Sequence, residues 1–144
     1  MTQLSLTLLL VFVSDQALKL VLRRVIVSDA LPLGPFGSVR MVPGQLWLRR
    51  LGGPSRGLMM WTFWVAAAVA LVIVSTWVPS SQVFVGLLLG GSLSNALESS
   101  LRGNVIDYVC LRYWPAFNVA DVVLAAGAIG TLTELLIAVC GMAS

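Results

Sequence analysis

"LMMWTFWVAAAVALVIVSTWV", Leu58 to Val78, runs through the middle of the chain without a single charged side chain. A helix needs about 20 consecutive apolar residues to cross the hydrocarbon core of a bilayer. The run therefore predicts a membrane-spanning helix. The whole chain agrees, because 58% of its 144 residues are hydrophobic and 10% are charged, and its mean hydropathy is +0.95. We expect one compact membrane domain over residues 1–144.

Three further windows extend this prediction to four spans, at about 4–22, 83–101 and 117–139 on either side of 58–78. The first window is not typical of a cleavable signal peptide, because no basic segment precedes it and Asp15 and Lys19 interrupt its apolar run. The expected fold is an all-α membrane protein with four transmembrane helices. The loop region 23–57 is expected to add a small interfacial β-hairpin.

The hairpin is predicted from "SVRMVPGQLWLRR", Ser38 to Arg50. Apolar and polar residues alternate on both sides of a Pro-Gly pair, which is typical of two short strands joined by a turn. Arginines and Trp47 lie in the same segment. Since these residue types favour the boundary between lipid and water, the hairpin is interpreted as a platform at the membrane surface.

Several classes of function are excluded by composition. The chain has no histidine, which excludes a Ser-His-Asp triad and any histidine-ligated metal site. Its two cysteines, Cys110 and Cys140, lie near opposite ends of the fourth span, roughly 30 Å apart at 1.5 Å per residue, and are expected to be free thiols. No phosphate-binding glycine loop or basic aromatic patch is present, so we expect no metal, no cofactor and no nucleic-acid partner.

For most charged and small residues within the spans, a structural role, in ion pairs or helix packing, is the simplest explanation. Asp15 and Lys19 are spaced i, i+4, which predicts a mutually neutralising pair inside the bundle. Glu98 and Arg102 have the same spacing and predict a pair at a helix end. Small residues recur every fourth position in the third span, a pattern that favours close helix packing. They are Gly86, Gly90 and Ser94.

Two carboxylates remain, Asp107 between the third and fourth spans and Asp121 at the start of the fourth. With four crossings, both lie at the same membrane face, and Asn118 lies three residues before Asp121. Two acids in one site of low polarity share a proton, so that one activates water while the other polarises an amide carbonyl. This pattern indicates aspartic proteolysis. The structural alternative is that both acids pair with Arg102 and Arg112.

Four motifs in chain order resemble those of the lipoprotein signal peptidases, also called signal peptidase II. The resemblance covers nearly the whole chain, and it implies an intramembrane aspartic endopeptidase without a cofactor. Such an enzyme cuts a diacylglyceryl-modified prolipoprotein just before its lipidated cysteine. The motifs are "DQALK" from Asp15, "MVPGQLWL" from Met41, "GGSLSNALESSLRGNVID" from Gly90 and "PAFNVAD" from Pro115. The resemblance implies that Asp107 and Asp121 are catalytic and that Asn95, Asn118, Asp15 and Lys19 support the site.

The chain also departs from the family pattern. Ser94 and Ser99 stand where the family has a glycine and an arginine, Glu98 replaces an aspartate, and Gly53 stands where an asparagine falls. These changes keep open a second hypothesis, a non-catalytic paralogue that keeps the fold and binds lipoproteins or lipids through its arginines.

The family implies a multi-pass protein of the bacterial inner membrane, with its active site towards the outer face and membrane lipids around it. We expect a monomer. A positive-inside count favours the opposite orientation, because the two long connections contain all the arginines outside the spans. These are Arg23, Arg24, Arg40, Arg49, Arg50, Arg56, Arg102 and Arg112. The family expectation is preferred.

Overall fold

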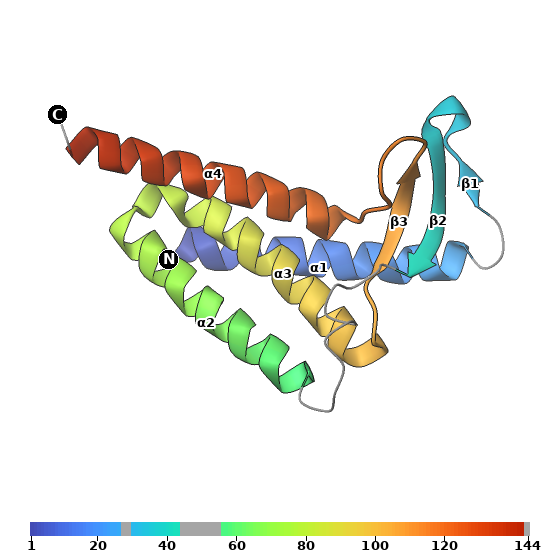
Figure 1. Cartoon of the computed structure of the whole chain (residues 1–144), viewed down its shortest axis with the longest axis horizontal. Helices are drawn as coiled ribbons and strands as arrows, with labels where there is room; N and C mark the ends of the chain where they lie inside the picture. Colours follow the sequence, from blue (N-terminus) through green and yellow to red (C-terminus); the bar gives the residue numbers. More distant parts are fainter. Residues whose placement is uncertain (27–29, 44–55, 143–144) are drawn as a thin grey trace.

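Four helices make up most of the computed structural model, which describes residues 1–26, 30–43 and 56–142. Each begins and ends within a few residues of a predicted span, and the predicted all-α membrane fold is confirmed. Their bounds are Thr2–Val25 (α1), Arg56–Trp77 (α2), Gln82–Arg102 (α3) and Val119–Met142 (α4). α1, α3 and α4 run side by side, and both chain termini lie at the same end of the bundle (Figure 1).

α3 differs from the other three helices in composition. Within the described residues, the helices long and apolar enough to cross a membrane by themselves are Thr2–Val25, Gly57–Trp77 and Val119–Met142. α3 packs against all three of them, and one of its faces is buried from Val85 to Glu98. Because other helices cover much of its surface, α3 can carry polar side chains at membrane depth where a lipid-facing helix could not.

Glycines on α3 allow its neighbours to approach closely. A Cβ atom on Gly86 would lie 2.8 Å from the backbone oxygen of Leu4, and one on Gly90 would lie 2.7 Å from that of Leu8. Gly91 faces α4 in the same way, 2.9 Å from the backbone oxygen of Ala120. The packing role predicted for the small-residue stripe is confirmed, since the two stripe glycines contact the backbone of α1.

A three-stranded antiparallel sheet lies across the end of the bundle where α1 ends and α4 begins (Figure 1). Its strands are Leu31–Pro32 (β1), Gly37–Pro43 (β2) and Ile106–Leu111 (β3), in the order β1-β2-β3. β1 and β2 form a hairpin around the short 3-10 turn Gly34–Phe36. β3 therefore joins the connection between α3 and α4 to the connection between α1 and α2.

A hairpin between the first two spans is present, formed by β1 and β2 around Gly34–Phe36. Of the hairpin predicted over residues 38–50, the described part is its first arm, which lies in β2. The predicted second arm falls in residues 44–55, outside the described part of the chain. The partner of β2 on its other side is β3, with Val42 opposite Asp107. This pairing carries Asp107 to the mouth of the helix bundle.

Candidate active site

The first turn of α4 is held by a reciprocal pair of side chains. The Asn118 side-chain oxygen accepts a hydrogen bond from the Asp121 backbone N–H (3.0 Å), and the Asp121 carboxylate accepts one from the Asn118 N–H (3.0 Å). This is a capping box, in which the residue before the helix and the third residue within it satisfy each other's amides. Asn118 and Asp121 therefore lie at the start of the helix with fixed side chains.

The N–H groups of the first two residues of α4 are satisfied by side chains of other elements, β3 and α1. Tyr108 Oη accepts a hydrogen bond from the Val119 N–H (3.0 Å), and Asp15 Oδ1 accepts one from the Ala120 N–H (3.1 Å). A helix leaves its first four N–H groups without partners of its own, and here a tyrosine of β3 and an aspartate of α1 supply two. Asp15 thus holds the start of α4 in place.

Asp15 also begins a buried chain of alternating charges. Its carboxylate accepts hydrogen bonds from Lys19 Nζ (2.7 Å) and from the Ser94 hydroxyl (2.5 Å). Lys19 lies 3.0 Å from Glu98 Oε2, and Glu98 in turn pairs with the guanidinium of Arg23. The predicted Asp15–Lys19 pair is confirmed.

The Glu98–Arg102 pair predicted from the i, i+4 spacing is wrong. Within the described residues the salt bridges of Glu98 are with Lys19 and Arg23, while the Arg102 side chain is exposed. Glu98 is buried and faces α1, so it pairs with the cations of that helix and not with Arg102 of its own helix. Its Oε2 also accepts a hydrogen bond from the Ile106 N–H (3.2 Å), one residue before Asp107.

Asn118 and Asn95 connect the two candidate catalytic carboxylates to this network. Asn118 Nδ2 donates to Asp107 Oδ1 (2.9 Å), so one asparagine contacts both acids. Asn95 Nδ2 donates to Asp121 Oδ1 (3.1 Å), while Asn95 Oδ1 accepts from Lys19 Nζ (3.0 Å). The structure therefore brings together all six residues singled out in the sequence.

The alternative in which the two acids pair with Arg102 and Arg112 is wrong for the described residues. The salt bridges among these residues join Lys19 and Arg23 to Asp15 and Glu98. The Arg112 guanidinium lies 5.4 Å from the centre of the Tyr113 ring. Within the described residues, Asp107 and Asp121 thus accept hydrogen bonds from amide groups and have no direct cationic partner.

Burial affects two ionisable side chains of β3. Burial and, to a smaller extent, the nearby charge of Asp121 raise the pKa of the Asp107 carboxyl from 3.8 to about 6, although the hydrogen bond from Asn118 opposes the shift. Burial likewise raises the pKa of the Tyr108 hydroxyl to about 12. Tyr108 therefore stays a neutral cap for α4, whereas Asp107 changes protonation state near neutral pH.

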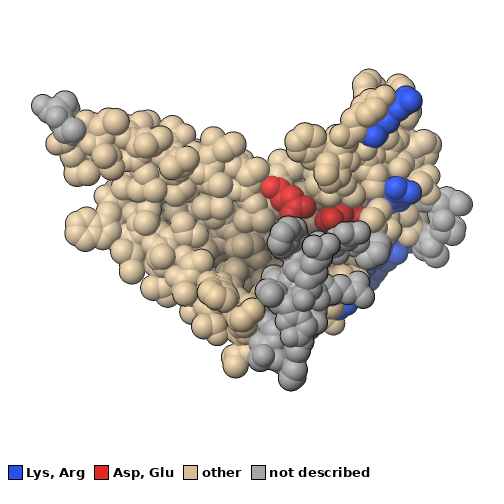
Figure 2. Space-filling view, in the orientation of Figure 1, with Lys and Arg blue, Asp and Glu red and all other residues tan. Residues whose placement is uncertain are grey.

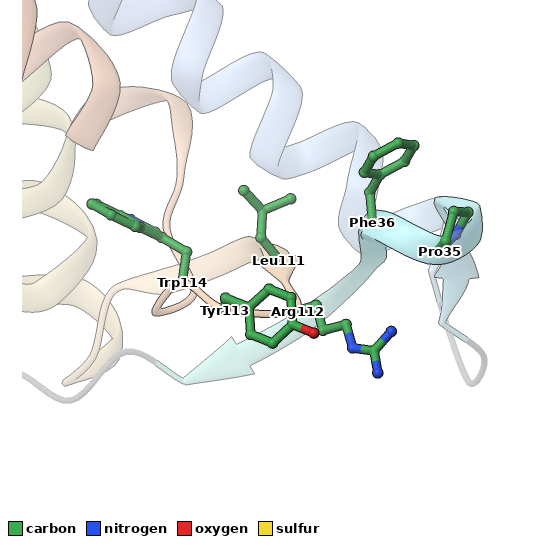
Figure 3. Close-up of a pocket in the computed structure, with 6 residues that line it drawn as sticks. All are labelled: Pro35, Phe36, Leu111, Arg112, Tyr113 and Trp114. Carbon is green, nitrogen blue, oxygen red and sulfur yellow. The ribbon is translucent and has the colours of Figure 1, made fainter.

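The carboxylates open to the surface in the notch between the helices and the sheet. Figure 2 shows acidic surface gathered in that notch, with basic surface lying over the sheet side of the molecule. Beyond Asp107, the far end of β3 forms a pocket of about 280 Å³ with the turn before β2. Phe36, Leu111 and Trp114 point to one side of it and the Arg112 guanidinium points away (Figure 3). An apolar recess thus lies on the strand that carries Asp107.

Metal chemistry has no candidate site in residues 1–26, 30–43 and 56–142, where no group of three metal-ligating side chains gathers. Cys110 and Cys140 are both free thiols, as predicted.

The sequence pattern of the family described as signal peptidase (SPase) II matches residues 7–137. The chain belongs to this family. Among its relatives, the lipoprotein signal peptidase of Syntrophomonas wolfei is 31% identical over 114 residues, which cover 72% of this chain and 76% of the relative. The lipoprotein signal peptidase of Cellvibrio japonicus is 29% identical over 92 residues. In that comparison the chain spans about half of the relative's length, 54%.

Solved structures show the same fold. One bacterial membrane enzyme superposes with a TM-score of 0.78 at 22% identity, covering 94% of both chains. A second has a TM-score of 0.76 at 24% identity and covers 94% of this chain and 88% of its own. At this identity the likeness establishes the fold alone.

Three residues that contribute to the site were not predicted to do so. Ser94 was interpreted only as a packing residue and a departure from a glycine, yet its hydroxyl contacts Asp15. Tyr108 and Arg23 carried no motif signal, because their partners lie on other elements. The Asn-x-x-Asp spacing of a capping box could have identified the start of α4. Gly53 lies outside the described residues.

Proposed function

We propose that this protein is an intramembrane aspartic endopeptidase that cleaves lipid-modified prolipoproteins just before the lipidated cysteine. The observation that carries the proposal is that Asn118 donates to both carboxylates, to Asp107 from its side-chain nitrogen and to Asp121 from its backbone N–H. Membership of the signal peptidase II family supports the substrate class. The carboxylate pair supports the mechanism, because it offers an acid and a base in one notch without a metal.

The two acids take different roles. Among the described residues, the groups that contact the Asp121 carboxylate are N–H donors, from Asn95 and from the Asn118 backbone, and an ionised carboxylate is purely an acceptor. Asp121 is therefore the base that draws a proton from the attacking water. Asp107, whose pKa is about 6, is the acid that polarises the scissile carbonyl.

The reaction adds water across one amide bond. As Asp121 takes a proton from water, the oxygen attacks the carbonyl carbon and the carbonyl oxygen receives the proton of Asp107. Collapse of this intermediate breaks the C–N bond as the proton held by Asp121 goes to the leaving amine, and one hydroxyl proton of the intermediate returns to Asp107 as the new carboxyl group forms. Proton transfer by positioned groups of this kind typically contributes about 10²- to 10⁴-fold to the rate.

The test is turnover of a diacylglyceryl precursor peptide by purified Asp107→Asn and Asp121→Asn protein. Each variant should lose at least about 100-fold in kcat while folding normally, and the double variant should be little worse than either, because the acids act as one unit. Near-normal rates in both single variants would contradict the mechanism. A wild-type protein that binds the precursor but never cleaves it would establish the second hypothesis, a non-catalytic binding paralogue. The presence of Ser99 where the family has an arginine favours that hypothesis.

We also propose that the sheet and the carboxylates lie on the outer face of the bacterial inner membrane. The described parts of both long connections belong to a single sheet, so one labelled position reports the side for both. In a variant with Cys110 and Cys140 changed to serine, a cysteine introduced at Ser38 should react with a membrane-impermeant thiol reagent in intact cells. Reaction only after the membrane is opened would reverse the orientation.

A further inference from the structure

A groove with two arginines at one end runs along the outside of α1, away from the carboxylates. It has a volume of about 350 Å³. Its lining residues are Phe12, Val13, Gln16, Ala17, Leu20 and Arg23 of α1, with Arg102 of α3. From Phe12 to Arg23 it extends along the helix by about 16 Å at 1.5 Å per residue. The carboxylates Asp107 and Asp121 do not line this surface, which meets the supporting network at Arg23.

The groove is apolar in the membrane and cationic at its surface end. Gln16 contributes little polarity, because its amide donates to the Ser94 hydroxyl at 2.7 Å. Phe12, Val13, Ala17 and Leu20 leave a purely hydrocarbon wall. Both arginines lie close to the ends of their helices, α1 and α3, at the end of the bundle that carries the sheet.

Arg23 and Arg102 retain capacity for an anion. Within the described part of the chain, Arg23 Nε is buried without a hydrogen-bond partner, although its Nη2 pairs with Glu98. The Arg23 side chain as a whole is 20% exposed and lines the groove. The buried chain is already neutral, since Asp15 and Glu98 balance Lys19 and Arg23, so exposed Arg102 adds an uncompensated positive charge.

We propose that this groove binds an anionic phospholipid of the surrounding bilayer, with one acyl chain along α1 and the phosphate between Arg23 and Arg102. Basic recesses between membrane helices suit anionic headgroups. A neutral diacylglyceryl group would fill the hydrocarbon wall equally well but would leave the positive charge of exposed Arg102 without a counterion. The headgroup phosphate is therefore what the groove selects, and this selection is independent of the proposed cleavage.

The experiment is lipid titration of the detergent-solubilised full chain, followed by native mass spectrometry. Dioleoylphosphatidylglycerol should bind more tightly than neutral dioleoylglycerol. Arg102→Gln should weaken phosphatidylglycerol binding about fivefold, the equivalent of about 1 kcal/mol for one surface charge. Arg112→Gln, which removes an equally exposed arginine on the sheet side, is the matched control and should leave the affinity unchanged.

A second pair of variants tests the hydrocarbon wall. Ala17→Trp places a large ring in the groove and should abolish the selective binding, whereas Ala66→Trp on the exposed surface of α2 should not. Equal affinity for the two lipids in the wild-type protein would overturn the proposal. An Arg102→Gln variant that binds phosphatidylglycerol like the wild type would also overturn it.

Discussion

Replacing Asp15 by asparagine should destabilise the protein without removing either catalytic candidate. The aspartate is fully buried and contacts three groups at once: Lys19, the Ser94 hydroxyl and the Ala120 amide. Asparagine has nearly the same shape and can still accept the hydrogen bond from Ala120. It cannot neutralise Lys19, which would remain buried with one carboxylate fewer.

The magnitude follows from the remaining partners of Lys19. Removing one member of a buried ion pair costs about 3–5 kcal/mol. Lys19 keeps Glu98 at 3.0 Å and Asn95 at 3.0 Å, so the lower end of this range applies, about 3 kcal/mol. At about 2–4 °C per kcal/mol for a chain of roughly this size, Tm should fall by about 6–12 °C.

The assay is thermal unfolding of the purified variant in detergent micelles, monitored by circular dichroism. Glu134→Gln is the control, because Glu134 forms no salt bridge with any described residue, and its Tm should change little. The double variant Asp15→Asn/Lys19→Met should be no less stable than Asp15→Asn alone, since no lysine is then left uncompensated. An Asp15→Asn variant that unfolds at the wild-type temperature would refute the reasoning.

Three other changes have expected outcomes. Because the pKa of Asp107 is raised from 3.8 to about 6, folded-state stability should fall as pH rises through that window, and a Tm series from pH 4 to 7 should show a smaller decline in Asp107→Asn. Asn118→Ala removes the helix cap and should lower the free energy of unfolding in urea by about 1–2 kcal/mol. It should also lower kcat about 100-fold, because both acids would be misplaced, and a normal kcat would contradict the bridging role. Gly91→Ala should destabilise by about 1–3 kcal/mol, because its Cβ would lie 2.9 Å from the Ala120 oxygen, whereas Gly57→Ala, which meets nothing within 4 Å, should not.

The helices and the Asp15–Lys19 pair were predictable because both depend on local spacing. Apolar length determines where a chain crosses a membrane, and an i, i+4 pair on a buried helix face has few other partners. The same rule failed for Glu98, whose partners Lys19 and Arg23 lie on another helix. Spacing along one helix carries no information about which helix packs against it.

β3 was not predicted because its pairing is entirely non-local. Ile106–Leu111 has the residue types of a strand but stands between two spans, with no neighbouring strand in sequence to form a hairpin. Its partner β2 lies in the connection between α1 and α2. The caps supplied by Tyr108 and Asp15 were missed for the same reason, since each reaches α4 from a distant element.

The first backbone N–H groups of α4 already have hydrogen-bond acceptors within the protein, which limits how they could assist the breaking of a peptide bond nearby. The N–H groups of Val119, Ala120 and Asp121 donate to Tyr108, Asp15 and Asn118, and that of Val122 reaches the Asn118 carbonyl at 3.5 Å. Many hydrolases stabilise the negative oxygen of a tetrahedral intermediate with free backbone amides of this kind. In this protein those amides are occupied before a substrate arrives, so α4 supplies no oxyanion hole. In the proposed mechanism, neutralisation of that oxygen then depends on the proton that Asp107 donates, so the rate depends on when this one proton is transferred.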